Sequence, residues 1–95
     1  MKELNFKEFT VPTDIRREHH RTGDARESFA NLIYKNVNGI RAHALAFKIY
    51  QSEGVEAYSP EEVRLIREVA ERLCAPNFID GLNAQLEGGG DESNI

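Results

Sequence analysis

Residues 39–54 read GIRAHALAFKIYQSEG, and this stretch decides how the rest of the chain must be arranged. At about 100° per residue its apolar side chains surround most of a helix axis, while Arg41 and Lys48 form one narrow cationic stripe. Gly39 and Gly54 tolerate positive φ and mark its two ends. A helix that is apolar on nearly all sides is covered by its neighbours. We therefore expect residues 40–52 to be the encased hub of the core.

The segment before this hub predicts an amphipathic helix at about residues 25–36. Asp24 followed by Glu27 has the spacing of a capping box, in which the two side chains satisfy free backbone amides of the first turn. Its apolar residues share one stripe and predict a single buried face; they are Ala25, Phe29, Leu32 and Ile33. Asn38 and Gly39 then supply the stop that separates this helix from the hub.

Two further helices are expected after the hub. Ser59 has the position of an N-cap, Pro60 follows at the first helical residue and Glu62 stands at the third, so a helix should run from Pro60 to about Cys74. Its buried stripe comprises Val63, Ile66, Val69, Ala70 and Leu73. Pro76 begins a short fourth helix that should direct Phe78, Ile79, Leu82 and Leu86 inward.

Residues 4–15, LNFKEFTVPTDI, have the spacing of a short strand or extended arm that ends near Pro12. A lone strand leaves backbone groups unpaired, so this arm must pair with itself as a hairpin, with a later segment, or with the same arm of a second subunit. The expected fold class is mainly α: a compact four-helix domain at residues 1–87 with an N-terminal strand or arm. The glycine-rich residues 88–95 should form a disordered tail.

Composition bounds the classes of function. The 95 residues suit one domain, and 40% hydrophobic with 29% charged residues is typical of a globular protein. No apolar run approaches the roughly 18 residues of a membrane helix, and the N-terminus lacks a signal-peptide core, which favours an intracellular protein. Cys74 is the only cysteine, so it has no disulfide partner in its chain and is best interpreted as a small buried apolar residue at a helix end.

The charge pattern argues against a dedicated nucleic-acid binder. The net charge is -4, and the basic segment from Arg16 to Arg21 lacks the aromatic residues on which bases stack, so a solvated loop is the favoured interpretation. DNA binding by the third helix ranks lower still because acidic residues alternate with its arginines. His19 and His20 are adjacent, whereas helical metal ligands are spaced three or four residues apart, so no metal site is expected.

Five residues of the first two helices could form a ligand site. Arg26, Arg41 and Lys48 could present three cations to one cleft, which would suit an anion such as a phosphate group. Tyr34 and His43 would complete that site. The alternatives are a solvated, ion-paired face for the cations and a buried, hydrogen-bonded core position for His43.

The stretch DARESFANLIYKNVNGIRAHALAFKIYQSEG, together with ERLCAPNFIDGLN, resembles small proteins encoded by bacteriophages and prophage-like mobile elements. The resemblance covers most of residues 4–86. It implies an accessory protein acting in the cytoplasm of a host bacterial cell, and it carries no activity or functional residue over to this chain.

Catalysis has little support, because no phosphate-binding glycine loop or nucleophile elbow appears and the carboxylates lie on exposed helix faces. We therefore expect neither a cofactor nor an enzyme. The first hypothesis is a protein-interaction module, homo-oligomeric through its arm, that binds a host or viral protein. The second is a small-molecule binder that sequesters an anionic, cyclic or linear nucleotide signal of host defence. A weak nucleic-acid-binding protein is the third.

Overall fold

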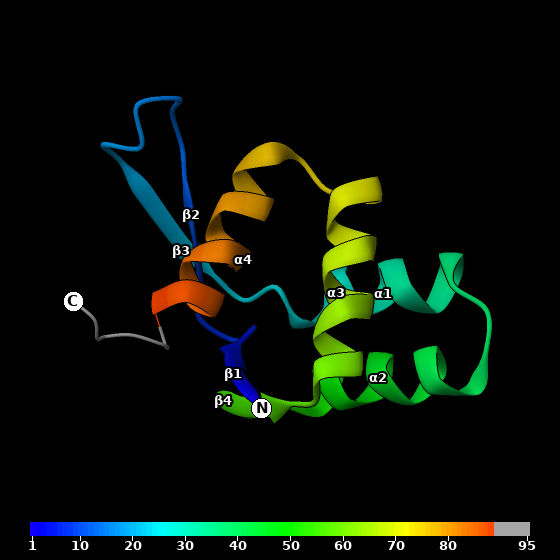
Figure 1. Cartoon of the computed structure of the whole chain (residues 1–95). Helices are drawn as coiled ribbons and strands as arrows, with labels where there is room; N and C mark the ends of the chain where they lie inside the picture. Colours follow the sequence, from blue (N-terminus) through cyan, green and yellow to red (C-terminus); the bar gives the residue numbers. More distant parts are fainter. Residues whose placement is uncertain (89–95) are drawn as a thin grey trace.

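The computed structural model describes residues 1–88, which form four helices and four short strands (Figure 1). The elements follow one another as β1 (Lys2–Asn5), β2 (Phe9–Pro12), β3 (His20–Gly23), α1 (Arg26–Asn36), α2 (Ile40–Gln51), β4 (Val55–Tyr58), α3 (Pro60–Leu73) and α4 (Pro76–Gly88). The tail predicted at residues 88–95 lies outside the described residues, apart from Gly88, the last residue of α4.

The predicted fold class, a mainly α four-helix domain, is wrong: the described chain is a mixed α/β domain, 56% helical and 18% strand. β1 pairs antiparallel with β4, and β2 pairs antiparallel with β3. The strands of the N-terminal arm therefore pair with other strands of the same chain. The sequence analysis did not predict β3, because all residues of β3 are exposed and show no alternation of apolar and polar side chains. It did not predict β4 either, because the four residues of β4 follow directly after Gly54.

The four predicted helices are confirmed, and the capping box of α3 with them. The Ser59 hydroxyl accepts a hydrogen bond from the Glu62 amide at 3.2 Å, and the Glu62 carboxylate accepts one from the Ser59 amide at 2.8 Å. The capping box predicted for α1 is wrong. Its N-cap is Ala25, which makes no side-chain cap, and the Asp24 carboxylate accepts hydrogen bonds from the backbone and side chain of Arg26.

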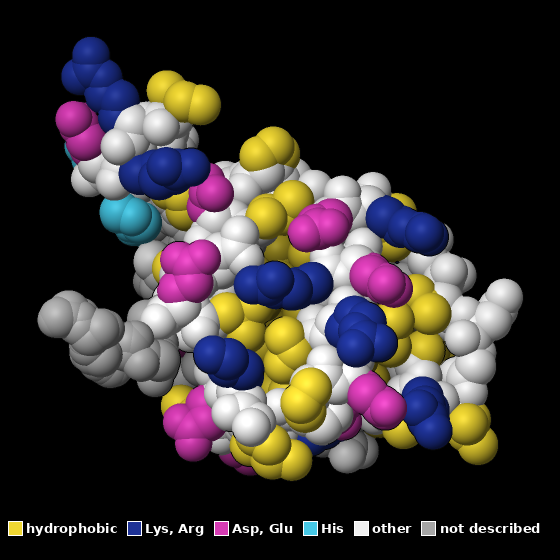
Figure 2. All heavy atoms as spheres, in the orientation of Figure 1, with side chains coloured by type: hydrophobic (Ala, Val, Ile, Leu, Met, Phe, Trp, Pro, Cys, Tyr) yellow, Lys and Arg dark blue, Asp and Glu magenta, His cyan; other side chains and the backbone are white. Residues whose placement is uncertain are grey.

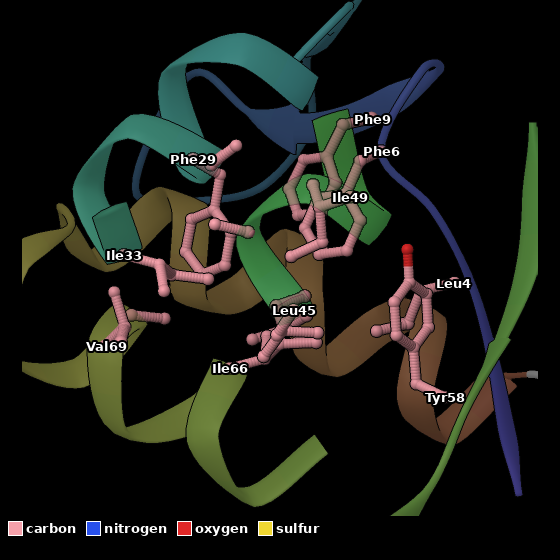
Figure 3. Close-up of a cluster of buried hydrophobic side chains, with 14 of the residues drawn as sticks. Leu4, Phe6, Phe9, Phe29, Ile33, Leu45, Ile49, Tyr58, Ile66 and Val69 are labelled. Carbon is pink, nitrogen blue, oxygen red and sulfur yellow. The ribbon is translucent and has the colours of Figure 1, made fainter. Parts of the chain in front are cut away.

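Stacked phenylalanine rings form the centre of the core (Figure 3). Phe6, from the turn between β1 and β2, stacks on Phe29 of α1 with ring centroids 5.3 Å apart and on Phe9 of β2 at 5.6 Å. Phe78 of α4 stacks on Phe9 at 4.5 Å and on Phe29 at 5.3 Å. Tyr58 of β4 meets Phe6 edge to face at 6.1 Å. The rings thus join the N-terminal strands to helices far along the sequence.

α4 lies directly against β1 and β2 (Figure 1). A Cβ atom at Gly81 would lie 2.5 Å from the carbonyl oxygen of Thr10, so the absence of a side chain there permits the close approach. The Gln85 side chain accepts a hydrogen bond from the Asn5 amide at 2.7 Å and donates one to the Asn5 carbonyl at 3.0 Å. Gln85 thereby covers the open edge of β1.

Candidate functional site

The expectation that residues 40–52 form an encased hub is wrong for half of α2. Its inward side, composed of Ala42, Leu45, Ala46 and Ile49, is buried in the core, with α1 as its main neighbour. Its other apolar residues face outward, with 85% of Ile40, 43% of Phe47 and 52% of Tyr50 exposed. The elements of the described chain cover α2 on one side, and its outer apolar residues are left at the surface.

These residues combine with one tyrosine of α1 into an aromatic face, defined here as Tyr34, His43, Phe47 and Tyr50. The His43 and Phe47 rings have centroids 4.9 Å apart, and Tyr34 lies 5.7 Å from His43 and 6.1 Å from Phe47. A shallow groove of about 330 Å³ runs between α1 and α2 on this side, with Ala30 and Ala46 among its lining residues. Glu27 and Asn31 of α1 complete its lining.

Of the five predicted ligand residues, the structure brings Tyr34 and His43 together on this face. His43 is exposed, so its interpretation as a core histidine is wrong. The two residues that the sequence analysis assigned to the core, Phe47 and Tyr50, supply the rest of the face. The signal that could have found them is their position on the helical wheel, where they share a side with His43 away from Leu45 and Ile49.

Arg26 lies at one end of the aromatic face and is held in place by its own chain. Its guanidinium donates to the Asp24 carboxylate at 2.8 Å and to the carbonyl oxygen of Ser52 at 2.6 Å. The hydrogen bonds from Arg26 lower the pKa of Asp24 to about 2. These contacts join the start of α1 to the end of α2, so Arg26 has a structural role in this position.

Arg41 and Lys48 lie on the opposite side of α2, toward the first turn of α3. Arg41 pairs with Glu61 at 3.1 Å, and Lys48 pairs with Glu62 at 3.0 Å while lying 4.6 Å from the ring centre of Tyr58. Burial opposes ionisation of Glu62, but hydrogen bonds from Ser59 and Lys48 outweigh it and lower its pKa. The three predicted cations therefore do not converge on one cleft.

The basic segment Arg16–Arg21 forms the tip of the β2–β3 hairpin, which projects from the body of the molecule (Figure 1), and continues into β3. Its charges are balanced locally: Arg17 pairs with Asp80 of α4 at 3.0 Å, and Arg16 lies 3.9 Å from Glu18. His19 hydrogen-bonds the Asp14 carboxylate at 3.0 Å and lowers the pKa of that carboxyl. Its positive charge is therefore partly neutralised by Asp14 and Glu18 of the hairpin and by Asp80 of α4.

The face that contains α3 presents a mixture of charges. Figure 2 shows Lys and Arg side chains interspersed with Asp and Glu side chains over this surface. A hollow there is lined by Lys2, Arg64 and Arg67 around Val63 and Leu86. The aromatic face differs from it because rings and small side chains, not alternating charges, form most of its lining.

Comparison with protein-family models, with curated proteins and with solved structures finds no match for this chain. Among the described residues, no helix has the length and apolar character that crossing a membrane requires.

Proposed function

We propose that this protein is a non-catalytic protein-interaction module and that the aromatic face is its binding surface. The observation that carries the proposal is the exposure of three aromatic rings and a histidine, close together, on the outer side of a helix pair whose inner side is buried in the core. Scattered exposed apolar residues are ordinary on a protein surface, whereas a contiguous patch marks a binding site.

The chemistry of the face suits a protein partner. Tyrosine and phenylalanine are enriched in the centres of protein interfaces because they bury a large area while few torsion angles are immobilised. The small side chains of Ala30 and Ala46 leave a groove that a partner side chain can enter. Glu27 and Asn31 provide a polar border, as interfaces commonly have.

The proposed setting follows the resemblance to phage and mobile-element proteins. In that setting the protein acts as an accessory factor in the cytoplasm of a host bacterial cell, and its partner is a host or viral protein. The alternative of a nucleotide binder receives less support, since Arg41 and Lys48 lie on the other side of α2 from Tyr34 and His43 and are occupied by carboxylates.

Affinity purification of the tagged full chain from bacterial cells, quantified by mass spectrometry, tests this function. Phe47→Glu places a charge in the middle of the aromatic face and should remove the partner from the purified material. In a binding assay with the purified partner, the dissociation constant should rise at least about 30-fold, as expected for a central aromatic residue.

Arg67→Glu is the matched control, because Arg67 is exposed on α3 and makes no ion pair among the described residues. This variant should retain the partner, and circular dichroism should confirm that both variants fold. Identical sets of copurifying proteins for the wild type and Phe47→Glu, together with unchanged self-association of the chain, would contradict the proposed surface.

A further inference from the structure

The polar residues beside the aromatic face repeat at a regular interval along α1. Glu27, Asn31 and Lys35 are each four residues apart and all are exposed. Residues at this interval form one ridge on a helix surface, with about 6 Å between neighbours. Neither Glu27 nor Lys35 has an ion-pair partner among residues 1–88. The ridge therefore offers an acid at one end, a base at the other and an amide between them.

This order is self-complementary. When two copies of α1 meet in antiparallel orientation about a two-fold axis at Asn31, Glu27 of each copy faces Lys35 of the other, because residues equidistant from the axis are exchanged. The carboxamide of Asn31, which both donates and accepts hydrogen bonds, then meets its own equivalent.

α2 has a matching pattern at the same level of the helix pair. His43, Phe47 and Gln51 also stand four residues apart, and Phe47 lines the groove together with Asn31. The two-fold axis that passes near Asn31 therefore passes near Phe47. It brings the Phe47 rings of the two copies together and places His43 opposite Gln51 of the second copy.

We propose that the occupant of the aromatic face is a second copy of this chain, packed face to face through α1 and α2 about this two-fold axis. The proposal rests on the aromatic face being a binding surface, and it adds the identity of the partner. Charge complementarity within the ridge favours a second copy, because the chain itself supplies the complementary order of base, amide and acid when its α1 runs in the opposite direction. The N-terminal arm has no part in this dimer, because both its strands pair inside the chain.

Sedimentation equilibrium of the full chain, for the wild type and a set of charge variants, tests this dimer. Glu27→Lys and Lys35→Glu each replace two attractive contacts by two repulsive ones, so each should raise the dimer dissociation constant about tenfold. The double variant Glu27→Lys with Lys35→Glu restores the pairing with reversed signs and should return the constant to near the wild-type value. Glu68→Lys on α3 makes the same charge change elsewhere and should have little effect.

Cross-linking tests the position of the axis. In a Cys74→Ser background, Asn31→Cys should form a disulfide-linked dimer on oxidation, because a residue on a two-fold axis lies next to its own equivalent. Arg67→Cys, on α3, should remain largely uncross-linked.

Two results would overturn this inference. One is a chain that stays monomeric up to about 1 mM. The other is a dimer whose dissociation constant is the same in both single charge variants and in the double variant. Neither outcome overturns the proposed function, which fails only if Phe47→Glu leaves every interaction of the protein intact. A monomer that loses a different protein partner on Phe47→Glu would keep the binding surface and reject the second copy.

Discussion

Tyr58 combines a completely buried ring with a hydroxyl group that has no hydrogen-bond partner among the described residues. Burial raises the pKa of Tyr58 to about 12, and the neighbouring Ser52 hydroxyl offsets only part of this effect. Ser52 is itself buried and donates its proton to the Ile49 carbonyl at 2.7 Å. The hydroxyl of Tyr58 is therefore a buried polar group that contributes little to stability.

Tyr58→Phe should leave the free energy of unfolding at neutral pH unchanged or raise it by up to about 1 kcal/mol. The larger difference is expected in alkali. The unfolded chain ionises Tyr58 near pH 10.0 and the folded chain only near 12, so the wild type loses stability as the pH rises between these values. The loss attributable to Tyr58 is up to about 2–3 kcal/mol and should be absent from the variant.

Urea denaturation at a series of pH values measures this difference. Tyr34→Phe removes an exposed hydroxyl and is the matched control. Wild-type and Tyr58→Phe curves that fall in parallel above pH 10 would show that the Tyr58 hydroxyl ionises equally readily in both states.

Arg26 connects two elements through a single side chain, so Arg26→Ala should lower the melting temperature more than Arg64→Ala, which truncates an exposed arginine of α3. The Asp24 carboxylate contributes through this contact above pH 3.8, and the contribution is lost as the pH falls through about 2. The difference in melting temperature between the wild type and Arg26→Ala should therefore become smaller in strong acid, where only the hydrogen bond from Arg26 to the Ser52 carbonyl remains. Curves that already coincide at neutral pH would contradict a structural role for Arg26.

At the scale of elements, the contact between α4 and β2 depends on the missing side chain of Gly81. A Cβ atom there would lie 2.5 Å from the Thr10 carbonyl oxygen and 2.9 Å from the Phe9 ring. Since the obstacle includes backbone, relief requires the whole helix to move away from the strand. That movement would also separate Gln85 from the edge of β1.

Gly81→Ala should lower the free energy of unfolding by about 1–3 kcal/mol, the usual cost of forcing extra atoms into a packed site. Gly23→Ala is the matched control because a Cβ atom at Gly23 meets nothing within 4 Å. Chemical denaturation of both variants measures the difference. A Gly81→Ala variant as stable as Gly23→Ala would mean that α4 does not approach β2 this closely.

At the scale of the whole molecule, the phenylalanine stack supplies stability and the aromatic face supplies exposed binding area. The two sets of rings lie on different sides of the α1–α2 pair, with Phe29 buried and Phe47 partly exposed. Substitutions in the two sets should therefore have separable effects.

Phe29→Ala should lower the free energy of unfolding by about 3–5 kcal/mol, because it leaves a cavity next to Phe6 and Phe78. Phe47→Ala should change it by about 1 kcal/mol or less, as is usual at the surface, while weakening any interaction of the aromatic face. Thermal and urea denaturation compare the two variants. A loss of stability for Phe47→Ala as large as that for Phe29→Ala would mean that the face is part of the core.

Local signals predicted the helices well and the sheets poorly. The Ser59, Pro60 and Glu62 cap acts within one turn, so the start of α3 can be read from neighbouring residues. The partner of β1 is β4, with Leu4 opposite Glu56, and nothing in either four-residue segment specifies the other. For the candidate site, the sequence analysis named Tyr34 and His43 as candidate ligand residues, although it favoured a core position for His43. It placed Phe47 and Tyr50 in the core, because the sequence shows that a residue is apolar but not what covers it.

The sequence by itself determined where the four helices lie, the capped start of α3 and which side of each amphipathic helix is apolar, since capping and periodicity are properties of adjacent residues. Only the tertiary structure decided which of the two apolar sides of α2 is buried. The remaining elements suffice to cover the side of Leu45 and Ile49, and they leave the side of Phe47 and Tyr50 at the surface. That choice depends on the number and position of packing neighbours, which no local pattern contains.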